Sequence, residues 1–331
     1  MKRKFRFTFN MALFLILIAL FAGIAILNPV FVSFDYLIGV MLRNIVEIGM
    51  MALTMTMIVI TGGIDLSIGS EMVLSSMVGG MAALKFGGVA GILVTLLVGA
   101  ACGLFNGFLI AKIKISPLVT TLATMYLFMG VARSLSHGDS VYTYDASQWL
   151  GTTDISGMPM QILFYVVLAL LFWFLLHRTA LGRKLYGIGL NENATRYCGI
   201  NTDRVKMQIY LFSGLMCAFA GMIWLGRFTS VKYDAGTSLG LRVVTVVVLG
   251  GTSILGGRGD MLGTVLATLI IAVLNSGLNV LSIPIDAQTI VQGTILVISL
   301  VCYSIFDVRA RKNRILKVPV EHQPGETQAN V

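Results

Sequence analysis

Charged residues are scarce in this chain of 331 residues, because Asp, Glu, Lys and Arg together make up only 12% of it. Soluble domains carry about 25% charged residues. Hydrophobic residues reach 56%, and the mean hydropathy is +0.88. Such a composition supplies too little polar surface for a water-soluble fold. It excludes a cytoplasmic enzyme, a nucleic-acid-binding protein and a disordered chain, and it indicates a membrane protein.

Residue patterns for catalysis or metal binding are missing as well. The three histidines lie far apart, and no Ser/His/Asp arrangement or HExxH motif occurs. Neither glycine cluster contains the lysine of a Walker A loop, so we expect no ATP binding by that route. The sequence predicts no catalytic residue, no metal and no cofactor. The cysteines show no CxxC or zinc spacing and no disulfide framework; they are Cys102, Cys198, Cys217 and Cys302.

Long apolar runs, in contrast, are abundant. A membrane-spanning helix needs about 20 mostly apolar residues. The segment 241–255 is shorter, rich in valine and ends in glycines, so it is either a short span or a broken, re-entrant one. We interpret the first run as a retained helix, since it lacks a clear signal-peptide cleavage site. The nine longer runs lie near 11–27, 45–61, 64–84, 88–111, 116–135, 159–177, 206–226, 261–281 and 287–306.

Basic residues predict the orientation of these spans. Four precede the first apolar run and five follow the last one, and cytoplasmic segments of membrane proteins are enriched in Lys and Arg. The segment 177–206 holds six Lys and Arg residues. The segment 136–158, in contrast, holds three Asp residues and no Lys or Arg. If 241–255 crosses, every basic segment lies inside. We therefore predict an all-α integral membrane protein of about ten transmembrane helices with both termini in the cytoplasm. Its parts are a basic N-terminus (1–10), a transmembrane domain (11–306) and a cytoplasmic tail (307–331).

Two glycine-rich breaks interrupt the apolar runs, in the similar segments Thr56–Ser70 and Thr245–Gly259. Their similarity suggests an internal duplication, as in many transporters. Glycine permits left-handed backbone, so the breaks can form a hinge or gate; tight helix packing by small residues is the alternative. We expect Asp65 or Ser67 to cap the following helix. The candidate gate residues are Gly62, Gly63, Asp65, Ser67, Gly250, Gly251, Gly256 and Gly257.

Glu47 stands out as a carboxylate inside the second apolar run. Carboxylates within a membrane are costly and often line a transport pathway. Arg43 lies one helical turn before Glu47, so a local ion pair is a simpler explanation. Snorkelling of the side chain at the outer end of the span is another.

The basic segment 177–206 is too long for a simple helix connection, which usually takes about 2–8 residues. It contains a short helical stretch near Glu192–Cys198, which Asn191 can cap. We interpret the segment as a docking surface for a soluble partner rather than an idle basic loop.

Five stretches together resemble the permease subunits of ribose-type (carbohydrate-uptake-2) ABC importers, over about residues 11–306. They are Thr61–Ser70, Ser116–Met125, Arg178–Gly189, Asn191–Ile200 and Val247–Gly259. The stretch Met125–Gly130 is most similar to the rhamnose and autoinducer-2 branch.

This resemblance implies a multi-pass permease of the bacterial inner membrane. The permease would import a monosaccharide or sugar-like molecule of the rhamnose, ribose or autoinducer-2 type. The implied partners are a separate ATPase subunit, a second permease (the same or a homologous chain) and a periplasmic or lipid-anchored substrate-binding protein. The segment 177–206 would then be the coupling segment. The chain departs from the family pattern at Leu190, Tyr197 and Cys198. When the ATPase-contacting positions of the family are matched to this sequence, the resemblance implies contacts at Asn191, Glu192, Ala194, Thr195, Arg196, Gly199 and Ile200.

An ion-coupled secondary transporter of small polar solutes is the alternative. It would need a carboxylate near the membrane midplane, close to the substrate site. The sequence places Glu47 near the end of its span and Asp65 at the inner boundary, which disfavours this mechanism.

Overall fold

The computed structural model describes residues 9–155, 157–284, 286–295, 297–298 and 301. The predicted cytoplasmic tail therefore lies outside the described residues, as does the N-terminal segment apart from Phe9 and Asn10. The described chain is almost entirely helical, as predicted. Its only strands are two short antiparallel pairs, β1 (Val141–Tyr142) with β4 (Ser230–Val231) and β2 (Asp154–Ile155) with β3 (Met158–Pro159).

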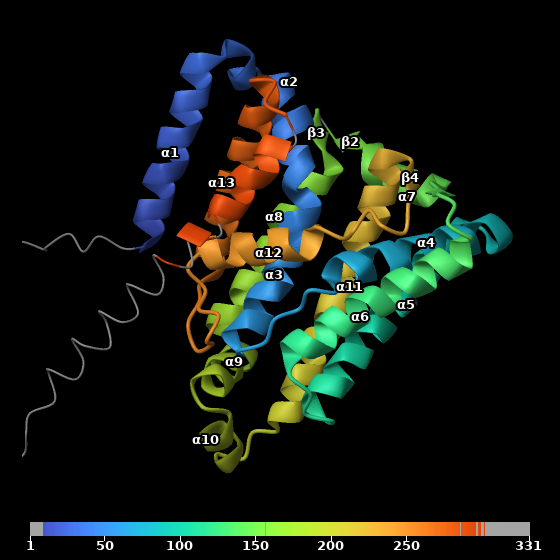
Figure 1. The fold of residues 1–331 in the computed structure, drawn as a ribbon, viewed down its shortest axis with the longest axis vertical. Helices are drawn as coiled ribbons and strands as arrows, with labels where there is room; N and C mark the ends of the chain where they lie inside the picture. Colours follow the sequence, from blue (N-terminus) through green and yellow to red (C-terminus); the bar gives the residue numbers. More distant parts are fainter. Residues whose placement is uncertain (1–8, 156, 285, 296, 299–300, 302–331) are drawn as a thin grey trace, which may run out of the picture.

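The helices follow the apolar runs of the sequence and are connected mostly by short turns (Figure 1). They are α1 (Phe9–Leu27), α2 (Phe34–Tyr36), α3 (Val46–Ile60), α4 (Ile68–Phe86), α5 (Gly88–Ala111), α6 (Pro117–Ser136), α7 (Asp145–Thr152), α8 (Met160–Arg178), α9 (Ala180–Leu190), α10 (Glu192–Tyr197), α11 (Thr202–Phe228), α12 (Leu239–Leu249) and α13 (Met261–Val280). Residues 286–295 are also helical.

Seven of the described helical stretches are long and apolar enough to cross a membrane. They confirm an all-α membrane protein. The helix α4 is not among them, because polar residues such as Glu71, Ser75 and Ser76 lower its hydropathy. The seven stretches are Phe9–Leu27, Phe34–Ile60, Gly88–Ala111, Pro117–Ser136, Met160–Arg178, Thr202–Phe228 and Met261–Val280.

Three predicted spans differ from the structure. The second begins at Phe34 rather than at residue 45, because a π-helical segment (Leu37–Leu42) and a 3₁₀ turn (Arg43–Ile45) join α2 to α3. The third begins at Ile68 rather than at residue 64, because residues 61–67 are not helical. In the segment 241–255, only α12 is helical. Its 11 residues span about 16 Å, roughly half of the hydrocarbon thickness.

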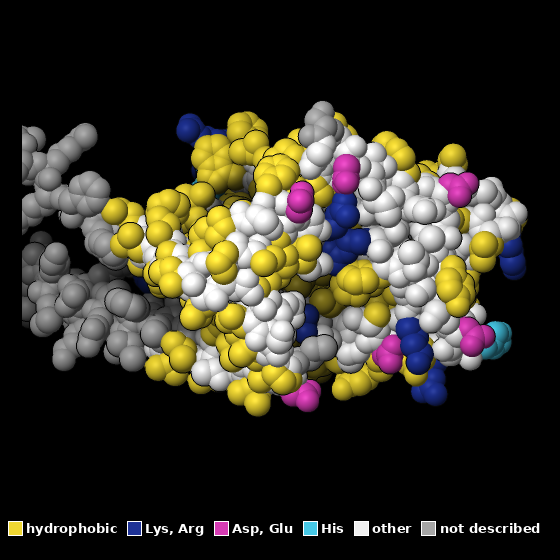
Figure 2. Space-filling model, turned by 90° about the horizontal axis from the view of Figure 1, so that it is seen from above, with side chains coloured by type: hydrophobic (Ala, Val, Ile, Leu, Met, Phe, Trp, Pro, Cys, Tyr) yellow, Lys and Arg dark blue, Asp and Glu magenta, His cyan; other side chains and the backbone are white. Residues whose placement is uncertain are grey.

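The helix α11 lies at the centre of the bundle, against α3, α4 and α5. Glycines allow this close approach, since a Cβ on Gly99 would overlap Gly214 and one on Gly103 would overlap Tyr210. At one end of the bundle lie α9 and α10, and at the other lie α2 and the β2–β3 hairpin (Figure 1). The half-length helix α12 lies crosswise between these ends. Figure 2 shows the end opposite to α10, where hydrophobic side chains dominate one part and the charged side chains are scattered.

The contacts of Glu47 correct both simpler explanations drawn from the sequence. Its side chain is only 1% exposed, so it does not snorkel. Its ion-pair partner is Arg227 at the end of α11, at 3.4 Å, whereas Arg43 pairs with Asp154 of the β2–β3 hairpin at 2.6 Å. Arg227 also donates a hydrogen bond to the carbonyl oxygen of Arg43. These contacts connect the 3₁₀ turn and the start of α3 to the hairpin and to α11 at the end opposite to α10.

Candidate coupling and gating site

The helix α10 begins at the residue that the sequence predicts. The side chain of Asn191 accepts a hydrogen bond from the backbone N–H of Ala194 at 2.9 Å. This N-cap satisfies one of the donors that a helix leaves free at its start. A short helix therefore forms between α9 and α11, at the far end of the bundle (Figure 1).

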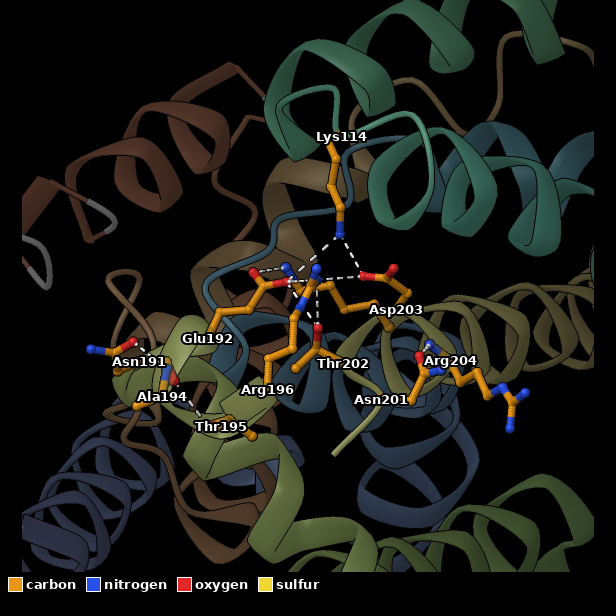
Figure 3. Close-up of polar contacts among 11 residues, drawn as sticks. Lys114, Asn191, Glu192, Ala194, Thr195, Arg196, Asn201, Thr202, Asp203 and Arg204 are labelled. Atoms are coloured by element: carbon orange, nitrogen blue, oxygen red, sulfur yellow. Dashed lines mark hydrogen bonds and ion pairs between the residues drawn. The ribbon is translucent and has the colours of Figure 1, made fainter. Parts of the chain in front are cut away.

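A network of charges fixes α10 to its neighbours (Figure 3). Glu192 pairs with Lys206 at 2.5 Å and with Arg196 at 3.3 Å. Arg196 also contacts Asp203 at 2.8 Å, and Lys114 contacts Asp203 at 2.5 Å. The network joins α10 to the first turns of α11 and to the α5–α6 connection.

Glu192 keeps its charge at neutral pH. Partial burial acts to raise the pKa of Glu192, but the hydrogen bond and charge of Lys206 outweigh burial and hold the pKa below the usual value of 4.5. Since the pKa is depressed, the stabilisation by this carboxylate is complete above its ordinary pKa. It is lost only as the pH falls through the lowered pKa. The network is consequently constant over the neutral range.

The outer face of α10 is partly apolar. Ala194 is exposed and Tyr197 is 90% exposed, and beside them Leu190, the last residue of α9, is 72% exposed. Thr195 is buried and lies against Gly187 of α9, so it faces the permease bundle. Tyr197 was absent from the predicted contact set, although its exposed ring gives the largest apolar surface on this helix. Of the rest of that set, Asn191, Arg196 and Gly199 are exposed, while Glu192 and Ile200 are half-buried.

The end of α9 lies directly on the two glycine-rich breaks. A Cβ on Gly189 would overlap both the carbonyl oxygen of Ile60 and the backbone nitrogen of Gly257. That nitrogen donates a hydrogen bond to the Ile60 oxygen at 2.8 Å. Tyr186 donates from its hydroxyl to the carbonyl oxygen of Gly259 at 2.8 Å. The breaks therefore contact each other and also the helix that leads to α10.

The break glycines have two kinds of environment. Four adopt positive φ, between +75° and +84°, in which L side chains are strained; they are Gly62, Gly251, Gly256 and Gly257. The other two are limited by packing. A Cβ on Gly63 would lie 3.0 Å from the Tyr210 hydroxyl, and one on Gly250 would lie 2.8 Å from the backbone of Gly263.

Comparison with known proteins identifies the family of this chain. A family model described as "Branched-chain amino acid transport system / permease component" matches residues 37–300. The ribose import permease protein RbsC of Bacillus subtilis (strain 168) is 39% identical over 290 residues, which cover 86% of this chain and 90% of RbsC. RbsC of Escherichia coli (strain K12) is 34% identical over 289 residues, with the same coverage. The autoinducer 2 import system permease protein LsrD of Salmonella typhi is 33% identical over 308 residues, which cover 91% of this chain and 92% of LsrD.

The chain belongs to the ribose-type permeases of ABC importers. This confirms the resemblance drawn from the sequence. The permease is a multi-pass transport protein of the bacterial inner membrane. No solved structure matches this chain significantly.

One polar cluster of this permease lies at the first break. Asp65 is completely buried within the bundle. Its Oδ1 accepts hydrogen bonds from the backbone N–H of Ser67 at 3.0 Å and from the Ser67 hydroxyl at 2.6 Å. Asn106 of α5 donates to the Ser67 hydroxyl at 2.8 Å and to Glu71 at 2.7 Å. Glu71 and Asn106 were missed, because single polar residues within apolar runs carry no motif.

The backbone of the first break also contacts α12. The carbonyl oxygen of Leu66 lies 2.6 Å from where a Cβ of Gly240 would be. Within the described residues, neither Asp65 nor Glu71 has a basic partner within ion-pair distance. Asp65 therefore holds the non-helical break ahead of α4 by accepting the Ser67 N–H. The predicted side-chain cap was wrong, because the N-cap residue Ser67 makes no side-chain cap bond to α4 and Asp65 bonds to Ser67, which precedes the helix.

Proposed function

We propose that this permease imports a monosaccharide or sugar-like solute, driven by an ATPase subunit that docks on α9 and α10. The relatives are named for ribose and autoinducer-2; rhamnose remains a prediction from the sequence. The carrying observation is the contact of Gly189 with Ile60 and Gly257, because it joins the docking segment to both glycine-rich breaks. ATP hydrolysis belongs, in this proposal, to the partner subunit.

The mechanism is alternating access between two packings of the bundle. When the ATPase moves α10, the charge network and α9 transmit the movement to the two breaks. The four break glycines with positive φ act as hinges, and the two tightly packed ones, Gly63 and Gly250, hold the breaks against α11 and α13. Thr195 faces inward and therefore does not belong to the ATPase contact. The proposed contact consists of the other predicted residues and Tyr197, namely Asn191, Glu192, Ala194, Arg196, Tyr197, Gly199 and Ile200.

Further partners complete the importer. A second permease, either the same chain or a homologue, would enclose the path. A periplasmic or lipid-anchored substrate-binding protein would deliver the solute to the end with α7 and the β2–β3 hairpin. The remaining surface of the bundle would contact the lipid bilayer, since many of its exposed side chains are large and hydrophobic.

We further propose ten crossings with both termini inside, with the basic segments 1–10 and 307–331 on the cytoplasmic side of the transmembrane domain 11–306. Seven of these crossings would be the seven long stretches. The other three would be α4, α12 together with residues 250–260, and the helix that starts at residue 286. Contacts support this order. His177 at the end of α8 lies 3.0 Å from Asp260 at the start of α13, and Asn10 also bonds to Asp260. The starts of α1 and α13 therefore lie at the same end of the bundle as α9.

Cys198 gives a direct test of the docking face, because it is exposed at the end of α10. In a Cys302→Ser background, a membrane-impermeant maleimide should label Cys198 only from the cytoplasmic side. Cys102 and Cys217 are buried and serve as internal controls. Added ATPase should protect Cys198, and labelling should return when the ATPase is washed off. Labelling from outside would overturn the orientation, and labelling unaffected by bound ATPase would overturn the docking face.

The buried carboxylates Asp65 and Glu71 are the one observation that favours the ion-coupled alternative. They are buried beside a broken helix, with no basic side chain of the described residues paired to them, as an ion-coupled transporter would require. Membership of the ABC permease family argues against this alternative, and so does the docking segment. We therefore assign the cluster a structural role at the break.

A further inference from the structure

A pocket of about 280 Å³ lies where α12, α13 and the helical residues 286–295 meet. Ile271, which lines it, is the eleventh of the 20 residues of α13. Since such a helix is about 30 Å long, as thick as the hydrocarbon core, the pocket lies near the middle of the membrane. Its lining residues are Ser238, Leu241, Arg242, Thr245, Ile271, Thr289, Gln292 and Gly293.

Arg242 is costly at this position in three ways. A guanidinium at mid-membrane depth is expensive unless it faces the bundle interior or a water-filled cavity. Arg242 has no ion-pair partner within the part of the chain that the structure describes. It also lies in the first turn of α12, where a positive charge opposes the helix dipole. Neither lipid contact nor helix stability explains an arginine here.

Two polar side chains of the helical residues 286–295, Thr289 and Gln292, line the same pocket. Gln292 donates to Asn275 of α13 at 2.9 Å, and this bond holds its amide beside the pocket. Gln288 donates to Asn279 at 2.8 Å. These interhelical bonds fix the helical residues 286–295 against α13. The pocket thus combines hydrogen-bonding groups with the apolar side chains of Leu241 and Ile271.

We propose that this pocket is a water-filled section of the transport path, in which Arg242 contacts hydroxyl-rich solutes and repels cations. The inference rests on the proposed import function. An arginine offers five N–H donors and no acceptor, so it binds the oxygens of a hydroxylated or anionic solute. The amide of Gln292 and the hydroxyl of Thr245 add further hydrogen-bonding groups, and the apolar side chains pack against C–H groups of the solute. The positive charge raises the electrostatic barrier for cations.

Cysteine modification tests the proposal without knowledge of the natural substrate. Gly293 lines the pocket, and a Cβ on it would meet no atom within 4 Å. In the full importer, with Cys198→Ser and Cys302→Ser, we would compare modification of Gly293→Cys by two methanethiosulfonates. The anionic ethylsulfonate should react roughly tenfold faster than the cationic ethyltrimethylammonium reagent, after correction for their rates with a free thiol. Modification would be measured with and without ATP.

Variants of the arginine identify the source of this selectivity. Arg242→Gln should abolish the rate difference, and Arg242→Lys, which keeps the charge, should retain it. Gly23→Cys on the exposed side of α1 is the matched control, because a Cβ there also meets no atom within 4 Å; it should resist both reagents. No modification of Gly293→Cys by either reagent, or a ratio unchanged in Arg242→Gln, would overturn the proposal. The labelling of Cys198 tests the proposed import function in a separate experiment. A negative result at Gly293→Cys would therefore overturn this inference without overturning the import function.

Discussion

Replacing Gly189 by alanine is expected to reduce ATP-driven uptake at least tenfold. The added methyl group would overlap the Ile60 carbonyl oxygen and the Gly257 backbone nitrogen. Both are backbone atoms, which cannot rotate away as a flexible side chain does, and overfilled packing costs about 1–3 kcal/mol or more. The substitution would also separate the hydrogen bond between Gly257 and Ile60. Uptake in proteoliposomes containing the purified importer, together with the ATP hydrolysed per solute, measures the effect.

Gly130→Ala is the matched control for this experiment. Gly130 lies in α6, and a Cβ there would meet no atom within 4 Å. We expect wild-type uptake from this variant. The Gly189→Ala permease should still bind the ATPase, because the outer face of α10 is unchanged. Normal coupling in Gly189→Ala would contradict the path from α10 to the breaks.

The second large effect is expected from Ala194→Trp. Ala194 is exposed on the face of α10 that we assign to the ATPase, so an indole there should overfill the docking groove. By analogy with overpacked cores, the cost is roughly 1–3 kcal/mol, which weakens binding about ten- to a hundredfold. Insertion of the permease should be normal, since no membrane span is altered. Recovery of the ATPase in a pull-down at limiting concentration measures the loss.

Gln148→Trp controls for the added bulk. Gln148 is exposed on α7, at the end of the bundle away from α10. It should leave ATPase recovery at the wild-type level. Equal recovery with wild-type and Ala194→Trp permease, with normal ATP hydrolysis, would show that the ATPase binds elsewhere.

Local signals in the sequence predicted the short helix α10 and its cap, whereas contacts between distant segments were not predicted. Asn191 caps α10 through a bond to a residue three positions away, so the sequence was sufficient to place it. Gly189 contacts Ile60 and Gly257, each of which lies more than 65 residues away from it in the sequence. Glu47 likewise pairs with Arg227 of a distant helix rather than with Arg43, one turn away. Only the three-dimensional packing selects such partners.

Hydropathy predicted most of the membrane helices and failed where polar or glycine residues interrupt them. The buried serines and Glu71 make α4 less apolar than a lone span would be, yet most of α4 is buried among other helices. The segment 241–255 was ambiguous in the sequence because its valines suit a helix and its glycines do not. In the structure, the helix α12 of 11 residues is followed by a non-helical break. A helix of 11 residues is too short for the pattern of about 20 apolar residues that identifies a membrane span.

The energy source of transport tests the central claim most directly. The purified permease, ATPase and substrate-binding protein would be placed in proteoliposomes and assayed with D-ribose, with and without ATP and with a protonophore. We predict uptake that requires ATP and the ATPase subunit and persists when the protonophore abolishes the proton gradient. Uptake by the permease alone, without ATPase or ATP, that follows an imposed H⁺ or Na⁺ gradient would contradict the account. It would assign the buried carboxylates Asp65 and Glu71 the ion-coupling role instead.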